Sequence, residues 1–247
     1  LRPPVLRPNI LDRSRLCDEL DEGMRLPLTL VSAPAGFGKT TLLVDWCRNC
    51  GAPVAWVTIE EGDSEVERFL LKIAAAFTTV DSTLGREALD LLQSIHTPPA
   101  LRVVESLVGD LDRISDEVVL IVDDLHLAEG AEISAVLSSF VERSPRHLHL
   151  YLATRADPGL PLARLRARGL LVEVRADELR FRNSEAAALV RSLIDVALDD
   201  HEIQLLGHRT EGWAAGLQMA ALSLKRAADP HRFIESFSGS NRFVMDY

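Results

Sequence analysis

An apolar run that leads into a glycine-containing turn and then a helix constrains this chain more than any other feature. Residues 28–32 are LTLVS, the pattern of a buried strand. Residues 33–40 are APAGFGKT, and the residues that follow have apolar side chains at helical spacing. A phosphate-binding loop requires this order of strand, loop and helix. Ala33 stands where the pattern usually has its first glycine, a position that needs a small residue.

The residue types in this loop fit the binding of a nucleotide's phosphates. Gly36 and Gly38 let backbone N–H groups surround a phosphate, and the helix beginning near Lys39 directs its positive dipole end at the same group. We expect Lys39 to lie between the β- and γ-phosphates and the Thr40 hydroxyl to bind Mg²⁺. The loop residues that we assign to nucleotide binding are Ala35, Gly36, Phe37, Gly38, Lys39, Thr40 and Thr41.

A second predicted strand ends in two carboxylates. Residues 118–122 are VVLIV, and Asp123 and Asp124 follow directly. On its own this pattern is also typical of a strand that ends in a helix-capping turn, but the phosphate loop favours a metal site. We expect Asp123 to bind Mg²⁺ directly or through water, and Asp124 to orient the attacking water as a general base. Because Asp is shorter than Glu, we expect slow turnover that suits a switch.

Further strands alternate with helices along the first part of the chain. We predict strands at 53–59, 149–154 and 171–175 and a helix at 131–143. This alternation indicates an α/β fold with a mostly parallel sheet and helices on both faces. Arg155 directly follows the strand 149–154, at the edge of the sheet where ligands bind. It is either a sensor of the γ-phosphate, which we favour, or an exposed arginine paired with a carboxylate.

The segment between the second and third predicted strands is expected to be helical. Ser64 and Glu67 have the spacing of a capping box, and the apolar face that follows predicts a helix. Residues 84–113 are also predicted to be mostly helical.

The pattern becomes purely helical near residue 184. We predict helices at 184–195, 199–208 and 212–226. We therefore divide the chain into a P-loop nucleotide-binding domain, 1–182, and a small helical subdomain, 183–247.

Composition excludes several classes of protein. The 247 residues include 37 acidic and 27 basic ones, a net charge of −10, which argues against a nucleic-acid-binding domain. No apolar run approaches the ~18 residues of a membrane helix, and because the first residues contain no apolar segment of the secretory type we expect no secretory signal. Three cysteines are too few for a disulfide framework and fit a reducing cytoplasm. Since the chain lacks an initiator Met, we expect it to be a piece of a longer protein.

Three features allow two interpretations each. Cys47 and Cys50 form a C-x-x-C motif, but it closes a predicted helix rather than opening one, which favours ordinary packing over redox or zinc chemistry. The arginines in 164–168 bind phosphate or pair with nearby acidic residues, and the acidic neighbours favour pairing. The small residues after Trp213 indicate close helix packing or a cofactor site, and we favour packing.

These motifs together resemble the N-terminal ATPase domain of the large ATP-binding LuxR-type (MalT-like) transcriptional regulators. Those regulators belong to the STAND class of signal-transducing NTPases and are related to NB-ARC domains. The resemblance spans nearly the whole chain, in the family's order. It is carried by PPVLRPNILDR at 3–13, APAGFGKTTLL at 33–43, IVDDLHL at 121–127, the arginine-rich stretch 152–181 and GWAAGLQMAALSL at 212–224.

The resemblance implies ATP or ADP with Mg²⁺ as cofactors and a weak ATPase activity that serves as a switch. It places Arg155 as the sensor and adds an adenine-covering segment around Arg7, Ile10 and Leu11. In such regulators the ATP form self-associates and the ADP form rests. DNA and a small-molecule inducer bind to domains beyond the ATPase region, and no membrane is involved.

Two other functions use the same loop. A small-molecule kinase would need an acceptor site and an arginine-rich lid, which the arginines of 155–168 imitate. An AAA-type ATPase would need an arginine finger from a neighbouring subunit, and none is evident in the sequence. The paired Asp123 and Asp124 favour water activation over transfer to an acceptor, which argues against the kinase.

Overall fold

The computed structural model describes residues 2–5, 11–94, 99–194, 198–227 and 229–237. Arg7 and Ile10, which were expected to cover the adenine, lie outside these residues. Leu11 is described and half-buried just before the first helix.

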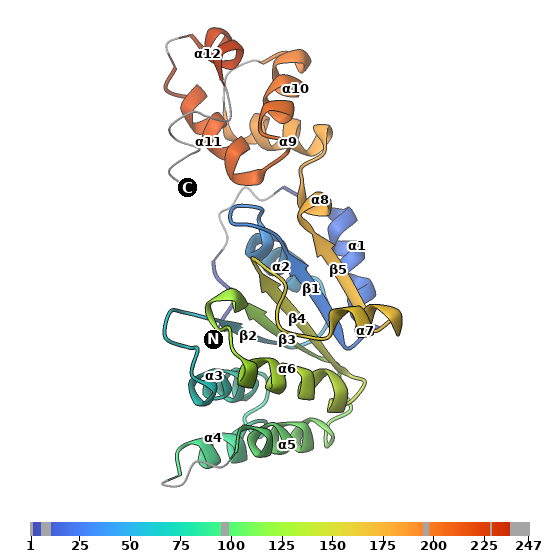
Figure 1. Ribbon diagram of the computed structural model, residues 1–247. Helices are drawn as coiled ribbons and strands as arrows, with labels where there is room; N and C mark the ends of the chain where they lie inside the picture. The colour runs from blue at the N-terminus through green and yellow to red at the C-terminus, as the bar shows by residue number, and fades with distance from the viewer. Residues whose placement is uncertain (1, 6–10, 95–98, 195–197, 228, 238–247) are drawn as a thin grey trace.

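A five-stranded parallel sheet forms the centre of the molecule (Figure 1). The strands lie in the order β2-β3-β4-β1-β5, and each neighbouring pair is parallel. β1 and β3 are buried along their whole length, which is why they appear in the sequence as continuous apolar runs. The strands are β1 Leu28–Ser32, β2 Val54–Thr58, β3 Val118–Asp123, β4 Leu148–Thr154 and β5 Leu171–Arg175.

Helices cover both faces of this sheet. Alternating side chains of β3 show the division: Val119 and Ile121 enter one apolar cluster, whereas Val118, Leu120 and Val122 enter the other. The first cluster includes residues of α1 Ser14–Gly23, α2 Lys39–Cys47 and α8 Ala176–Leu179. The second includes residues of α3 Val66–Val80, α4 Arg86–Leu92, α5 Ala100–Leu111, α6 Ala131–Arg143 and α7 Leu162–Ala167. The fold is therefore α/β, as predicted.

The last part of the chain is helical and has an apolar core of its own. Its helices gather at one end of the molecule, beyond the sheet (Figure 1). They are α9 Asn183–Leu193, α10 Asp200–Arg209, α11 Ala214–Leu224 and α12 Pro230–Ser236. The sequence predicted the first three, but not α12. The boundary that we placed at residue 182 stays a prediction.

Most predicted elements are confirmed, and one local detail is wrong. The strands 28–32 and 171–175 and the helix 131–143 have the predicted bounds. The capping box of Ser64 and Glu67 does not form, since α3 begins at Val66 with Glu65 at its N-cap and no side-chain cap. None of the helices in the described ranges is long and apolar enough to cross a membrane.

Candidate functional site

The glycine-containing loop connects β1 to α2 at the carboxyl edge of the sheet. Gly36 and Gly38 have φ angles of 76° and 82°, in the left-handed region that favours glycine. Gly38 is the N-cap of α2, so Lys39, Thr40 and Thr41 form the first turn of this helix. The free N–H groups and the positive dipole end of α2 thus lie at the loop, in the arrangement that binds phosphate.

Lys39 is held over the same loop. Its ammonium donates hydrogen bonds to the carbonyl oxygens of Ala33 and Pro34, at 2.8 and 3.0 Å. Burial lowers the pKa of Lys39, while the carboxylates of Asp124 and Asp123 oppose that shift. An ammonium has three N–H donors, so one remains for a phosphate oxygen after these two bonds. The loop therefore fixes the position of the charge.

Thr40 and Asp123 meet where α2 approaches the end of β3. The Thr40 hydroxyl donates to Oδ1 of Asp123 at 3.1 Å, and the Asp124 N–H donates to the same oxygen at 3.0 Å. Asp123 is 1% exposed. Burial and the neighbouring Asp124 carboxylate raise the pKa of Asp123 to about 6. The two predicted Mg²⁺ ligands are thus brought together, although 83 positions separate them in sequence.

The chain turns sharply at Asp124. Its φ of 55° and ψ of 34° are left-handed, an uncommon conformation for a residue other than glycine. A short 3₁₀ helix, η1 Leu125–Leu127, follows and brings Nδ1 of His126 to 3.9 Å from Oδ1 of Asp124. We assigned no role to His126 from the sequence, although it stands two residues after the predicted base, Asp124.

Arg155 lies at the end of β4, next to the strand that carries Asp123. It is exposed, and its charge contributes to lowering the pKa values of Lys39 and His126, which places it in the same group of side chains. The other predicted loop residues differ in burial: Phe37 is buried, Ala35 is half-buried and Thr41 is exposed.

The helical part of the chain also contacts the loop. The indole Nε1 of Trp213 donates to the carbonyl oxygen of Ala35, and the N–H of Ala215 donates to that of Gly36, both at 3.0 Å. The predicted close packing is confirmed, since Ala220 and Ala221 are fully buried in the apolar core of the helical part. The sequence did not indicate the contact of Trp213 with the loop.

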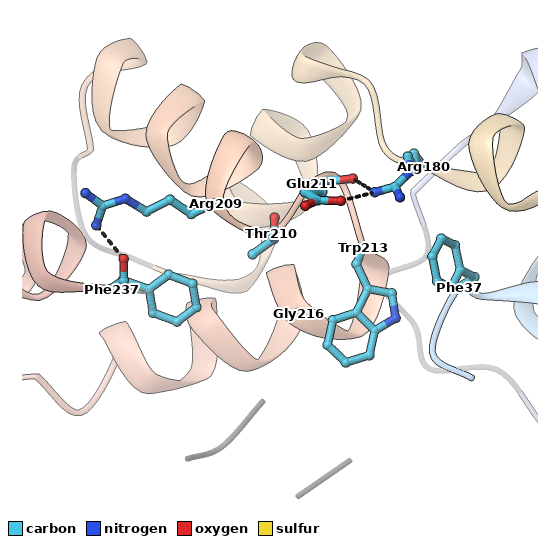
Figure 2. Close-up of a pocket in the computed structure, with 8 residues that line it drawn as sticks. All are labelled: Phe37, Arg180, Arg209, Thr210, Glu211, Trp213, Gly216 and Phe237. Atoms are coloured by element: carbon cyan, nitrogen blue, oxygen red, sulfur yellow. Dashed lines mark hydrogen bonds and ion pairs between the residues drawn. The ribbon is translucent and has the colours of Figure 1, made fainter. Parts of the chain in front are cut away.

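A pocket of about 280 Å³ lies beside this contact. Figure 2 shows the rings of Trp213 and Phe37 at one end of it, with Arg180 directed toward Glu211. Arg180 donates to the carbonyl oxygen of Glu211 at 2.6 Å and forms an ion pair with its carboxylate at 3.1 Å. These contacts join the segment that follows α8 to the turn that precedes α11.

The cysteine motif and the arginines of 164–168, which each allowed two interpretations, make contacts that favour the structural one. Burial raises the pKa of Cys47 to about 12, and the Cys50 thiol donates to the Cys47 carbonyl, so this motif is inert packing. Arg166 pairs with Glu173 at 2.6 Å, and Arg164 pairs with Glu142 at 3.7 Å. In the part of the chain that the structure describes, no group of three or more His, Cys, Asp or Glu side chains is arranged to hold a metal.

Comparisons with known proteins agree with this site. No protein-family model matches the chain. It is 32% identical over 249 residues to the serine/threonine-protein kinase PknK of Mycobacterium tuberculosis, covering 100% of this chain and 22% of that protein. It is 29% identical over 226 residues to the HTH-type transcriptional regulator MalT of Yersinia pestis, covering 92% and 25%. The chain thus spans about a quarter of these relatives' length.

Solved structures share the fold. A Walker-type ATPase of Pyrococcus abyssi has a TM-score of 0.64 at 19% identity, covering 95% of this chain and 73% of that one. A STAND protein with a tetratricopeptide-repeat sensor, from Pyrococcus horikoshii, has a TM-score of 0.63 at 13% identity, covering 92% and 31%. With the loop, Lys39 and Asp123 in place, the chain is a P-loop ATPase domain related to the LuxR-type regulator MalT and to PknK, with STAND-like structural neighbours.

Proposed function

We propose that this chain is the ATP-binding, slowly hydrolysing switch domain of a LuxR-type transcriptional activator that acts in the cytoplasm. In this proposal the ATP state favours self-association of the whole protein, and the ADP state is the resting one. DNA and a small-molecule inducer bind to parts of the protein outside this chain. The relationship to MalT supports this assignment.

The observation that carries the proposal is the set of contacts that joins the loop to β3. Lys39 is fixed by two loop carbonyls, and Thr40 is hydrogen-bonded to Asp123. A cation, a hydroxyl and a carboxylate therefore lie around the N-terminus of one helix. This combination matches a triphosphate with its metal ion, because each group recognises a different part of that ligand.

The oxygen ligands fit Mg²⁺. This cation prefers oxygen donors and is usually held by one or two carboxylates together with substrate phosphates. Thr40 and Asp123 supply a hydroxyl and a buried carboxylate that already share a hydrogen bond. Bound there, Mg²⁺ would neutralise phosphate charge and offset the cost of an ionised Asp123 in a buried position.

For hydrolysis we assign the proton-accepting role to Asp124. Its carboxylate accepts no hydrogen bond within the described ranges, and its side chain is 36% exposed, so a water molecule can reach it. Lys39 and Arg155 stabilise the charge that develops on the transferred phosphoryl group. Asp124 accepts the proton of the attacking water as the water oxygen bonds to the γ-phosphorus and the bond from that phosphorus to the leaving ADP oxygen breaks.

The switch step depends on the loop's carbonyl groups. Lys39 occupies those of Ala33 and Pro34, Trp213 occupies that of Ala35, and Ala215 occupies that of Gly36. Four successive carbonyls thus connect the phosphate-contacting lysine to α11. We assign to this connection the transmission of the difference between ATP and ADP into the helical part.

The binding step is tested with Lys39→Ala. We expect ATP affinity to fall by at least about 100-fold, because a charge-assisted phosphate contact is lost, while circular dichroism stays near that of the wild type. Lys225→Ala is the matched control, since Lys225 is exposed at the C-cap of α11. Equal ATP affinities of the two variants would remove Lys39 from the site.

The hydrolysis step is tested with Asp124→Asn. We expect ATP and Mg²⁺ binding to persist and phosphate release to slow by roughly 100-fold or more. Phosphate and ADP should appear in equal amounts in the wild type. ADP without inorganic phosphate would instead support transfer to an acceptor, as in a kinase. Turnover of several ATP molecules per second would contradict the slow switch.

A further inference from the structure

A strained turn lies directly before α11. Glu211 has a φ of 50°, in the left-handed region that residues other than glycine seldom adopt, and Gly212 follows with a φ of 69°. Such a conformation costs free energy, so it persists where the surrounding structure holds it. The next residue is Trp213, the N-cap of α11, whose indole donates to the phosphate loop. The conformation of this turn therefore sets where α11 begins relative to the loop.

Arg180, which follows α8, holds this turn through its side chain (Figure 2). Its guanidinium donates to the Glu211 carbonyl oxygen at 2.6 Å and pairs with the Glu211 carboxylate at 3.1 Å. The same guanidinium lies 5.9 Å from the centre of the Phe37 ring in the phosphate loop, within the range of a cation–π contact. A planar cation with several donors and a flat face can make both contacts at once. Arg180 thus connects the turn and the loop.

The backbone that carries Arg180 is held more firmly than its side chain. Arg13, which is 7% exposed, donates to the Arg180 carbonyl oxygen at 3.1 Å. The Phe181 N–H donates to the carbonyl oxygen of Gly212 at 2.8 Å. By contrast, the side chains of Arg180 and Glu211 are 36% and 76% exposed. Because ion pairs between exposed side chains contribute little to stability, this pair can open and close while the backbone of Arg180 stays in place.

The contacts beyond the turn orient the N–H groups of the loop. The carbonyl oxygens of Ala35 and Gly36 accept hydrogen bonds from Trp213 and Ala215. In a trans peptide the C=O and the N–H point in opposite directions. Fixing these two carbonyls therefore directs the N–H groups of Gly36 and Phe37 away from their α11 partners, as donors for a phosphate.

We propose that Arg180 and Glu211 form a latch, a reversible ion pair that keeps the turn before α11 left-handed and thereby keeps Trp213 and Ala215 on the phosphate loop. When the latch opens, Glu211 relaxes to a more common conformation and the loop carbonyls lose their partners. The loop then releases nucleotide faster. This inference adds a means of regulating the site, and it rests on the proposed binding of nucleotide at the loop.

The release rate of a fluorescent ADP analogue tests the latch in the whole chain. Arg180→Met keeps the apolar stem and loses both contacts with Glu211. We expect it to release the analogue about 3- to 10-fold faster than the wild type, the range that a weak ion pair and one hydrogen bond allow. Arg180→Lys keeps a charge without the planar fork and should fall between the two. Adding Glu211→Gln to Arg180→Met should cause no further change, because the two side chains act as one unit.

An ion pair within the helical part provides the matched control. Arg191 of α9 pairs with Asp200 of α10 at 2.6 Å, and their side chains are 57% and 84% exposed. Arg191→Met removes a comparable exposed pair that joins two helices of the same part. We expect this variant to release the analogue at the wild-type rate.

Hydrogen exchange at the Ala215 amide reports on the latch without nucleotide. Ala215 lies in the first turn of α11, where an N–H has no acceptor in its own helix, so its protection comes from the Gly36 carbonyl oxygen. We expect this amide to exchange about 3- to 10-fold faster in Arg180→Met and at the wild-type rate in Arg191→Met. The amide of Ala220, in the middle of α11, should exchange equally in all three proteins.

These measurements separate the latch from the proposed function. A wild type that binds no ADP analogue overturns the proposed nucleotide binding, while exchange at Ala215 still decides whether the latch forms. A wild type that binds the analogue, with release or Ala215 exchange unchanged in Arg180→Met, overturns the latch alone. Exchange that is equally accelerated at Ala220 also overturns it, because Arg180 would then only stabilise the helical part.

Discussion

The indole nitrogen of Trp213 donates a hydrogen bond to the carbonyl oxygen of Ala35, 3.0 Å away and 178 positions earlier in the sequence. The next contact, from the Ala215 N–H to the Gly36 carbonyl, has the same length. Together they place the N-terminus of α11 directly against the loop that begins α2. A change in the backbone of this loop therefore has a direct mechanical path to the helical part.

The Trp213 contact predicts a fluorescence change on nucleotide binding. Trp46 and Trp56 lie in the sheet core, at 2% and 0% exposure, and their indoles have partners there. We expect Mg²⁺ with ATP to alter tryptophan emission in the wild type and not in Trp213→Phe. The variant also loses one hydrogen bond, at a cost of about 1 kcal/mol. An emission change that persists in Trp213→Phe would contradict the contact's response to nucleotide.

We also predict that replacing Gly36 by alanine disturbs the contact between the loop and α11. A Cβ there would lie 2.7 Å from the Ala215 Cβ and 2.7 Å from the Trp213 indole nitrogen. Gly51→Ala is the matched control, because Gly51 has nearly the same φ, 75° against 76°, with nothing within 4 Å. We expect each substitution to lose about 1 kcal/mol to backbone strain, and Gly36→Ala to lose about 1–3 kcal/mol more to overpacking.

Urea unfolding and ATP affinity check this comparison. Gly36→Ala should bind ATP more weakly than the wild type, because the loop must shift away from α11. Gly51→Ala should bind ATP normally. If both variants lose the same stability and keep the same affinity, the close packing of α11 on the loop has no energetic weight.

The acidic residue Glu173 predicts a pH-dependent contribution to stability. Its hydrogen bonds to Arg166 and Arg175 lower the pKa of Glu173 to about 2. Because the pKa of Glu173 is lower in the folded state, its ionised carboxylate stabilises the fold. This contribution is fully present above the unfolded-state pKa of about 4.5 and is lost as the pH falls toward 2. We expect Glu173→Gln to cost about 1 kcal/mol at pH 7, a small value because solvent screens the half-exposed Arg166.

Unfolding in urea at pH 7 and at pH 3 tests this sign. The difference between Glu173→Gln and the wild type should shrink at the lower pH. Glu87→Gln, at an exposed site in α4, should show no difference at either pH. A penalty for Glu173→Gln that grows in acid would show that the carboxylate does not stabilise through its ionised form.

The sequence predicted those parts of the site whose positions follow from chain order. Thr40 begins a helix after one buried strand and Asp123 ends another, and parallel strands bring such ends to one edge. Their hydrogen bond at 3.1 Å is a consequence of that order. The strands β1 and β3 could be predicted from the sequence as well, because strands buried on both faces leave continuous apolar runs.

Contacts that depend on tertiary packing left no such pattern. Nothing near Trp213 in the sequence indicates that its indole reaches Ala35, since the contact depends on how α11 packs across the loop. The capping box failed for a similar reason. Asp63 accepts hydrogen bonds from Lys72 and from the Glu60 N–H, and these hold the loop before α3 in place of a Ser64 cap.

We predict that the buried carboxylate of Asp123, which the proposed metal site requires, lowers the stability of the metal-free fold. Its pKa of about 6 lies above the unfolded value of about 4. A raised pKa means that the folded state holds its proton more tightly, so stability falls as the pH rises from about 4 to about 6 and then stays level. We expect metal-free Asp123→Asn to be more stable than the wild type by about 2 kcal/mol at pH 7.

Thermal unfolding in EDTA between pH 4 and pH 8 measures this difference. It should be largest above pH 6 and vanish near pH 4, where both proteins carry a neutral group at this position. Asp90→Asn, at an exposed site, should match the wild type throughout. With Mg²⁺ and ATP the order should reverse, because the ionised Asp123 then gains a cation that the amide binds poorly. An Asp123→Asn variant that is less stable than the metal-free wild type at pH 7 would show that Thr40 and the backbone already compensate the buried charge.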